Sequence, residues 1–140
     1  MISGYETPVG EGRCDVDNSI LIVEDHDAVR LSLRDWLSTS FPNCRFNEAR
    51  SGEEALALAR QKPPDIVLMD IWLPQMNGIE ATKRIKSLMP QTHVVMLTLY
   101  EAPDYVSNAT AAGATAYVLK RKMHTDLIPT VRALLSRTKA

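Results

Sequence analysis

The stretch of sequence that decides the fold is residues 65–78, which read DIVLMDIWLPQMNG. Ile66–Met69 is a run of four apolar residues that stops at Asp70, a pattern typical of a strand buried on both faces of a sheet. The residues after Asp70 include proline, asparagine and glycine, and a helical pattern follows over about 79–88. The stretch therefore predicts a buried strand, an acidic strand end and a loop that leads into a helix.

The same strand–helix unit recurs along the whole chain. Further buried strands are predicted at residues 20–23, 93–97 and 116–119, and a weaker strand near a sheet edge at 45–49. A helical pattern follows each strand, with Ser51 expected as a cap at the start of the second helix and Gly113 at the end of the fourth. Five strand–helix pairs in strict alternation predict an α/β fold, in which helices cover both faces of a parallel, doubly wound sheet.

The first helix is expected to bury one face that contains Val29, Leu33 and Trp36. Arg30 lies off that face, and Asp27 is expected to cap the start of the helix.

Length and composition fit one globular domain. The chain has 140 residues, 45% of them hydrophobic and 24% charged, with a formal net charge of −1. That charge argues against bulk electrostatic capture of nucleic acid by this chain alone, and no apolar run approaches the roughly 20 residues of a membrane span. Cys14 and Cys44 show no metal-ligand spacing and no disulfide framework, so a reducing, cytosolic setting is expected.

Polar side chains follow four of the predicted strands at their carboxyl ends. They are Glu24 and Asp25 after the first strand, Asp70 after the third, Thr98 after the fourth and Lys120 after the fifth. Ligands of open α/β sheets bind along this edge, so these groups are expected to meet in one crevice. Three carboxylates repel one another unless a cation lies among them, and an all-oxygen donor set suits Mg²⁺.

This set of side chains also suits phosphoryl transfer. An ionised Asp70 can attack a phosphoryl group and form an aspartyl phosphate. Mg²⁺ and Lys120 would neutralise the transferred charge, and the Thr98 hydroxyl would donate to a phosphoryl oxygen.

These residues resemble the response-regulator receiver domain of bacterial two-component systems. The resemblance is carried by residues 23–25, 65–78, Thr98 and 116–120, and it extends over about 18–137. Within that family the chain is most similar to receivers that precede a LuxR-type helix-turn-helix domain, judging by MLTLY at 96–100 and GATAYVLK at 113–120. The resemblance implies a flavodoxin-like sheet of five parallel strands in the order 2-1-3-4-5, with five helices.

The resemblance also implies a role for each matching residue. Asp70 would accept a phosphoryl group from a histidine kinase or a phosphotransfer protein. Asp25 and Asp70 would ligate Mg²⁺ directly and Glu24 through water, and the backbone carbonyl of Trp72 would complete the protein ligands.

The response to phosphorylation is implied in the same way. Lys120 would pair with the phosphoryl oxygens, Thr98 would move toward them, and Tyr117 would change rotamer with Thr98. The outcome would be a remodelled protein-interaction surface. The chain is expected to be either a receiver fragment of a longer transcription regulator, whose DNA-binding output domain is absent from this chain, or a stand-alone receiver that acts on protein partners, and the LuxR-type similarity favours the fragment. A homodimer on phosphorylation, through the first or last helices, is a further possible partner. The chain is expected to be no enzyme, to lie in the cytoplasm and to bind no membrane.

The sequence departs from the family pattern at several positions. Glu24 stands where aspartate is common, Leu99 where a smaller residue is common, and Arg121 where many receivers have proline. Trp72 is unusually bulky for its position and is placed to shield an acyl phosphate from water.

Three other interpretations compete with a phosphoacceptor. An aspartate-nucleophile phosphatase would carry a second carboxylate at position 72, where this chain has Trp72. A flavin- or nucleotide-binding protein would need a glycine-rich first loop rather than the acidic residues 24–27. A receiver-shaped interaction module that is never phosphorylated remains as the alternative. His26 and His93 are interpreted as loop and strand-end residues without a metal-type partner.

The predicted domain organisation has three parts. Residues 1–18 are expected to form a flexible leader, 19–137 the receiver domain and 138–140 a short tail.

Overall fold

The structure is a computed structural model that describes residues 18–138. Its five strands are β2 (Ser19–Val23), β3 (Arg45–Ala49), β4 (Ile66–Met69), β5 (His93–Thr98) and β6 (Ala116–Leu119). Its five α-helices are α1 (Asp27–Ser40), α2 (Gly52–Gln61), α3 (Gly78–Leu88), α4 (Pro103–Ala112) and α5 (Met123–Thr138). A short 3₁₀ turn, η1 (Lys120–Lys122), joins β6 to α5.

The strands form one sheet in the order β3-β2-β4-β5-β6, and every neighbouring pair is parallel. In order along the chain this is 2-1-3-4-5, so the predicted sheet and its strand order are confirmed. Val23 pairs with Met69, and Met69 pairs with Met96. This register brings the carboxyl ends of the central strands to one edge, where the residues that follow them meet.

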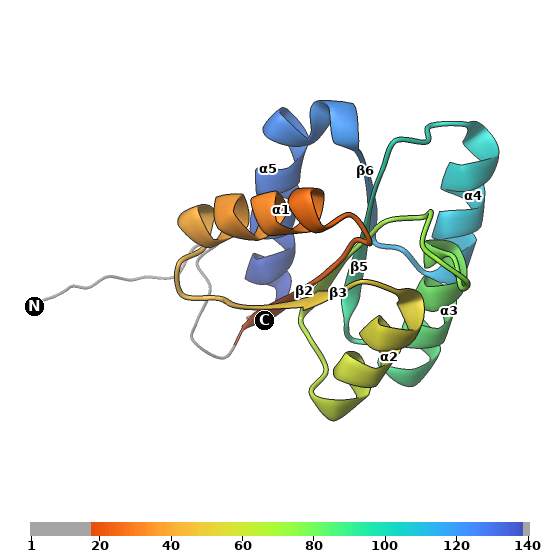
Figure 1. The fold of residues 1–140 in the computed structure, drawn as a ribbon, viewed down its shortest axis with the longest axis horizontal. Helices are drawn as coiled ribbons and strands as arrows, with labels where there is room; N and C mark the ends of the chain where they lie inside the picture. The colour runs from red at the N-terminus through yellow and green to blue at the C-terminus, as the bar shows by residue number, and fades with distance from the viewer. Residues whose placement is uncertain (1–17, 139–140) are drawn as a thin grey trace, which may run out of the picture.

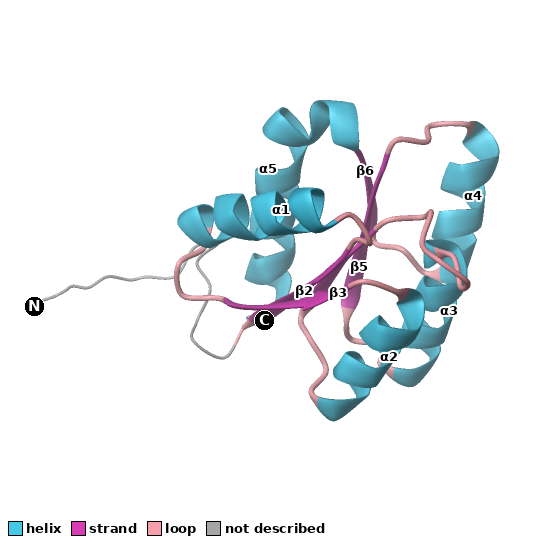
Figure 2. Ribbon diagram, in the orientation of Figure 1, coloured by secondary structure: helices cyan, strands magenta, loops and turns pink. Residues whose placement is uncertain are grey.

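Helices cover both faces of the sheet: α1 and α5 lie on one side, and α2, α3 and α4 on the other (Figures 1 and 2). Alternate strand residues face opposite layers. Ile20 and Ile22 belong to the core beneath α1 and α5, whereas Leu21 and Val23 belong to the core beneath the other three helices. The buried, wholly apolar strands are thus explained by helices packed against both faces.

Two of the predicted helix caps are confirmed. The Ser51 hydroxyl accepts a hydrogen bond from the Glu54 amide at 3.1 Å. Gly113, with φ of 107°, ends α4 in the left-handed conformation that glycine adopts most easily.

The expectations for the start of α1 are wrong. His26 occupies the N-cap position without a side-chain capping bond, and Asp27 lies inside the first turn, where it pairs with Arg30. Arg30 is only 4% exposed. Periodicity placed this side chain off the core-facing stripe, but its guanidinium turns toward the end of β2 and edge strand β3 instead of toward solvent.

Most of the predicted leader and tail lies outside the described residues. Asn18, placed in the leader by the sequence, is buried, and its carbonyl accepts a hydrogen bond from the Arg45 amide at 2.9 Å.

The expectation about the cysteines is wrong at Cys44, which is disulfide-bonded, while Cys14 lies outside the described residues. The cysteines therefore give no support to a reducing compartment. Within 18–138, no helix combines the length and the apolar character that crossing a membrane requires.

Candidate functional site

The carboxyl edge of the sheet brings together three charged side chains that are far apart in sequence. Glu24 follows β2, Asp70 follows β4, and Lys120 follows β6. The Lys120 ammonium lies 2.7 Å from Oε1 of Glu24 and 3.2 Å from Oδ2 of Asp70. Both carboxylates are nearly buried, at 1% and 7% exposure. One lysine therefore bridges two carboxylates that solvent barely reaches.

Asp25 and His26 extend this cluster toward solvent. His26 Nδ1 lies 2.9 Å from Oε2 of Glu24 and 3.3 Å from Oδ1 of Asp25. The Asp25 Oδ1 atom is buried and has no hydrogen-bond partner, because its contact with His26 does not have hydrogen-bonding geometry. One potential ligand atom from each of Glu24, Asp25 and His26 lies within 4.8 Å of the other two.

The proximity of His26 to two carboxylates was missed in the sequence. A loop, not a helix, holds these three consecutive residues together, so no ligand spacing marks them. The Glu24 carboxylate, expected to reach a metal through water, is here bonded to Lys120 and His26.

The surroundings move the pKa values of the buried groups in different directions. Burial alone would raise the pKa of Glu24, but hydrogen bonds from Lys120 and His26 outweigh it and lower that pKa. The pKa of Asp70 is raised, because burial and the nearby Glu24 charge outweigh the opposing effect of Lys120. Burial lowers the pKa of Lys120, yet its bonds to the carboxylates raise it overall. The lysine thus stays charged, and Asp70 is the carboxylate whose ionisation is least favoured.

The loop after Asp70 is held in place by backbone contacts. The Asp70 amide donates to the Val23 carbonyl at 3.2 Å, and the Gly78 amide donates to the Ile71 carbonyl at 2.7 Å. A Cβ atom on Gly78 would lie 1.9 Å from the Asp70 carbonyl oxygen, so only glycine permits this approach. The start of α3 is thereby pinned against the residue that carries the buried carboxylate.

Thr98 and Tyr117 are linked through Tyr100. Thr98 is fully buried at the end of β5, and its hydroxyl accepts from the Tyr100 amide at 3.4 Å. The Tyr117 hydroxyl donates to the Tyr100 carbonyl. Both proposed switch residues therefore contact one residue of the β5–α4 loop, a link for which the sequence carries no signal.

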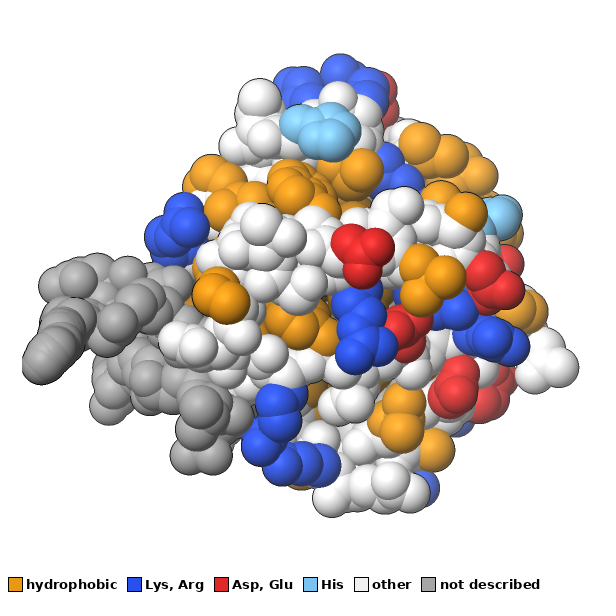
Figure 3. All heavy atoms as spheres, turned by 60° about the vertical axis from the view of Figure 1, so that its left-hand side comes forward, with side chains coloured by type: hydrophobic (Ala, Val, Ile, Leu, Met, Phe, Trp, Pro, Cys, Tyr) orange, Lys and Arg blue, Asp and Glu red, His pale blue; other side chains and the backbone are white. Residues whose placement is uncertain are grey.

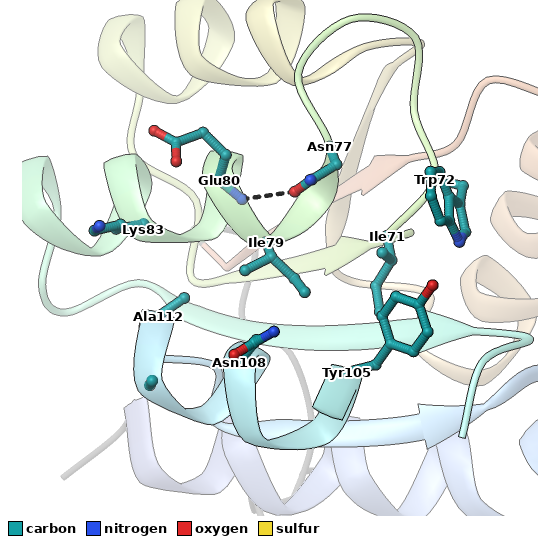
Figure 4. Close-up of a pocket in the computed structure, with 10 residues that line it drawn as sticks. Ile71, Trp72, Asn77, Ile79, Glu80, Lys83, Tyr105, Asn108 and Ala112 are labelled. Carbon is teal, nitrogen blue, oxygen red and sulfur yellow. Dashed lines mark hydrogen bonds between the residues drawn. The ribbon is translucent and has the colours of Figure 1, made fainter. Parts of the chain in front are cut away.

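Trp72 lies beside two tyrosines rather than in the core. Its ring is 5.6 Å from that of Tyr100 and 6.4 Å from that of Tyr105, and the residue is 51% exposed. Trp72 and Tyr105 lie at one end of a cavity of about 420 Å³ between α3 and α4 (Figure 4). None of Glu24, Asp70 and Lys120 lines this cavity, so it is separate from the charged cluster.

A divalent cation fits the acidic edge of this site. Asp25 offers a buried oxygen that accepts no hydrogen bond, and an oxygen of Glu24 lies within 4.8 Å of an Asp25 oxygen. The nearly buried Asp70 carboxylate is linked to Glu24 through Lys120. Hard cations such as Mg²⁺ bind oxygen donors of this kind. The donor chemistry of the site therefore agrees with the ion that the sequence suggested.

Comparison with known proteins defines the class of this chain. The family model described as response regulator receiver domain matches residues 20–132. The chain belongs to this family, whose members are signalling domains of two-component systems.

Individual relatives place the chain more narrowly. The response regulator protein VraR of Staphylococcus aureus (strain NCTC 8325 / PS 47) is 39% identical over 113 residues, which are 81% of this chain and 54% of VraR. A LuxR-family response regulator from Aurantimonas sp. SI85-9A1 has a structure that superimposes with a TM-score of 0.80 at 32% identity, covering 85% of each chain. A CheY-like receiver from Methanospirillum hungatei JF-1 gives a TM-score of 0.81 at 28% identity, covering 87% of this chain and 96% of the other. The chain is thus similar to LuxR-family receivers and spans about half the length of VraR.

Proposed function

We propose that Asp70 accepts a phosphoryl group from a histidine kinase or a phosphotransfer protein, in a reaction that depends on Mg²⁺. The observation that carries this proposal is the position of the Lys120 ammonium, which contacts both Asp70 and Glu24, together with a buried Asp25 oxygen that accepts no hydrogen bond. Receiver domains as a family bind Mg²⁺. Asp25, Asp70 and the Trp72 backbone carbonyl would hold the ion here, with Glu24 acting through water.

The transfer step uses Asp70 as the nucleophile. An ionised Asp70 oxygen attacks phosphorus while the bond from phosphorus to the donor nitrogen breaks, and the departing imidazole keeps the electron pair and takes up a proton. The bound cation would supply charge neutralisation for the phosphoryl oxygens. Because burial opposes the charge on Asp70, the Lys120 ammonium at 3.2 Å supports the reactive form.

Lys120 and Thr98 then respond to the new group. The Lys120 ammonium exchanges its bond with Asp70 for one with a phosphoryl oxygen. The Thr98 hydroxyl gives up the hydrogen bond that it accepts from the Tyr100 amide and donates to another phosphoryl oxygen. Release of the Tyr100 amide loosens the loop that also holds the Tyr117 hydroxyl. We infer that Tyr117 changes rotamer as a result, which alters the surface around β6, α4 and α5.

Incubation with acetyl phosphate or phosphoramidate and Mg²⁺, followed by intact mass measurement, tests the proposal. The chain should gain one phosphoryl group, and neither Asp70→Asn nor a sample with EDTA should gain it. An unmodified wild-type chain, under conditions where another receiver reacts, would favour the alternative of a receiver-like interaction module.

The wider roles are proposals that rest on the relatives. We propose that the phosphorylated receiver controls transcription through a DNA-binding output domain outside this chain, that it acts in the cytoplasm as a switch rather than as an enzyme, and that it binds no membrane. The domain limits are proposed as 19–137 for the receiver, between a leader and a short tail.

Homodimer formation on phosphorylation is proposed through the first and last helices. An apolar groove of about 400 Å³ lies between them and is lined by Val29, Trp36 and Met123, with His124 beside the Trp36 ring. Figure 3 shows hydrophobic side chains gathered next to a histidine on this side of the molecule. Sedimentation before and after phosphorylation would test for the dimer.

A further inference from the structure

Arg30 is a buried cation that joins three parts of the molecule. Its Nε donates to Oε1 of Glu48 on edge strand β3 at 2.9 Å, and its Nη2 donates to Oδ1 of Asp27 on α1 at 2.7 Å. Its Nη1 donates to the backbone carbonyl of Glu24 at 3.0 Å. The guanidinium therefore directly reaches the loop between β2 and α1, residues 24–26, which we call the acidic loop, although it lies outside the charged cluster.

The acidic loop depends on such backbone contacts. The Glu24 amide donates to the Ala49 carbonyl at 3.0 Å, and the Arg30 amide donates to the His26 carbonyl at 2.9 Å. Asp25 lies between these anchors, and its buried Oδ1 has no hydrogen bond of its own. The direction of the Asp25 carboxylate is therefore set through the backbone on either side. The Arg30 side chain bonds to the Glu24 side, whereas the bond to the His26 carbonyl comes from the Arg30 backbone amide, which other residues would also provide.

We propose that Arg30 is a positioning residue for the divalent-cation site, and that it holds the Glu24–Asp25 backbone so that the Asp25 carboxylate faces the ion. The inference rests on the proposed function, because it takes Asp25 and Asp70 as the ligands of Mg²⁺. Replacement of a residue that orients the metal ligands without contacting the ion commonly changes metal affinity by about 10- to 100-fold.

The geometry requires arginine rather than any cation. A planar guanidinium presents donors in fixed directions, so it serves acceptors on β3, on α1 and in the loop at the same time. The single ammonium of lysine cannot present donors in these three fixed directions. Arg30→Lys should therefore lose part of the effect although it keeps the charge.

Two possible roles of Arg30, as a nearby positive charge and as a positioning residue, predict opposite changes in Mg²⁺ affinity when Arg30 is replaced by a neutral residue. If Arg30 acted only as a nearby positive charge, its removal would strengthen the binding of another cation. If it positions the loop, its removal weakens that binding. The sign of the change in Mg²⁺ affinity thus separates the two roles.

The experiment is a Mg²⁺ titration followed through the backbone amide signals of ¹⁵N-labelled protein, which report the fold and the dissociation constant together. Arg30→Met should remain folded and bind Mg²⁺ about 10- to 100-fold more weakly than the wild type. The matched control is Arg34→Met: Arg34 also pairs with Glu48, but it is half exposed and contacts the strand residue rather than the acidic loop. This control should bind Mg²⁺ as the wild type does.

Each outcome has a separate meaning. A wild-type chain that does not respond to Mg²⁺ would refute the proposed function itself. If the wild type binds and folded Arg30→Met binds equally well or more tightly, the positioning role is refuted. If Arg30→Met does not fold, the Mg²⁺ affinity of Arg30→Lys is measured instead. An affinity equal to that of the wild type in Arg30→Lys would overturn the proposal.

Discussion

The surroundings of the Asp70 carboxylate disfavour its charged form, and Lys120 offsets only part of that effect. Asp70 is 7% exposed and subject to repulsion from the Glu24 charge, and the Lys120 ammonium lies 3.2 Å from its Oδ2 atom. Burial raises its pKa above the ordinary value of 3.8, so folding disfavours its ionised form. The chain therefore holds Asp70, its proposed nucleophile, at a cost in stability.

Asp70→Asn should therefore stabilise the fold at neutral pH in the absence of Mg²⁺. A raised pKa in the folded state means that the native chain loses stability as Asp70 ionises with rising pH. The gain in free energy of unfolding should be on the order of 1 kcal/mol at pH 7. It should shrink as the pH falls through the raised pKa and vanish below 3.8, where Asp70 is protonated in both states. Urea unfolding at several pH values measures this, and a gain that is independent of pH would contradict the account.

Trp72→Ala should shorten the half-life of the phosphorylated protein several-fold. The Trp72 ring packs against Tyr100 and Tyr105 and joins the loop after Asp70 to the loop after Thr98, so its loss should open the site to water. Loss of phosphate after removal of the donor gives the half-life. Leu88→Ala is the control, since Leu88 is as exposed, at 50%, but lies at the far end of α3. Equal half-lives in all three proteins would remove the shielding role.

At the scale of elements, the contact between the β4–α3 loop and the start of α3 fixes the site. Gly78 comes so close to the Asp70 carbonyl that a Cβ atom cannot be accommodated without moving backbone. The start of α2 has a looser counterpart at Gly52, where a Cβ would lie 3.3 Å from its neighbours.

Gly78→Ala should therefore destabilise the fold far more than Gly52→Ala. Overpacking against backbone costs about 1–3 kcal/mol or more, whereas Gly52→Ala should change the free energy of unfolding by less than about 1 kcal/mol. Chemical denaturation of both variants gives the comparison. Equal losses would show that the close approach at Asp70 is relieved without cost.

The sequence was informative where structure is local or periodic. Apolar runs such as Ile66–Met69 predicted the strands, and the residues just beyond them predicted the charged edge that joins Glu24, Asp70 and Lys120. Arg30 was not predictable, because its partner Glu48 is 18 residues away and comes near only when β3 pairs with β2. The link from Thr98 through Tyr100 to Tyr117 was missed for the same reason, since it joins residues on separate strands.

At the scale of the whole molecule, the proposed ion binding would be coupled to folding. An ion that binds only the folded chain stabilises it by an amount set by its concentration relative to the dissociation constant. The proposed donors follow β2 and β4, so a bound ion would tie together two strands of the central sheet.

Mg²⁺ should therefore raise the melting temperature of the wild type. The gain should be about 2.7 kcal/mol at a concentration 100 times the dissociation constant. Asp25→Asn should lose most of this gain, while Asp35→Asn on the exposed side of α1 should keep it. Calorimetry with and without Mg²⁺ gives both values, and an equal gain in the two variants would place the ion elsewhere.

The most direct test of the central claim is a crystal structure of the Mn²⁺-loaded protein, with the ion located by its anomalous scattering. We expect one peak in contact with the carboxylates of Asp25 and Asp70 and the backbone carbonyl of Trp72. A peak bound only by Glu24, Asp25 and His26, away from Asp70, would contradict it.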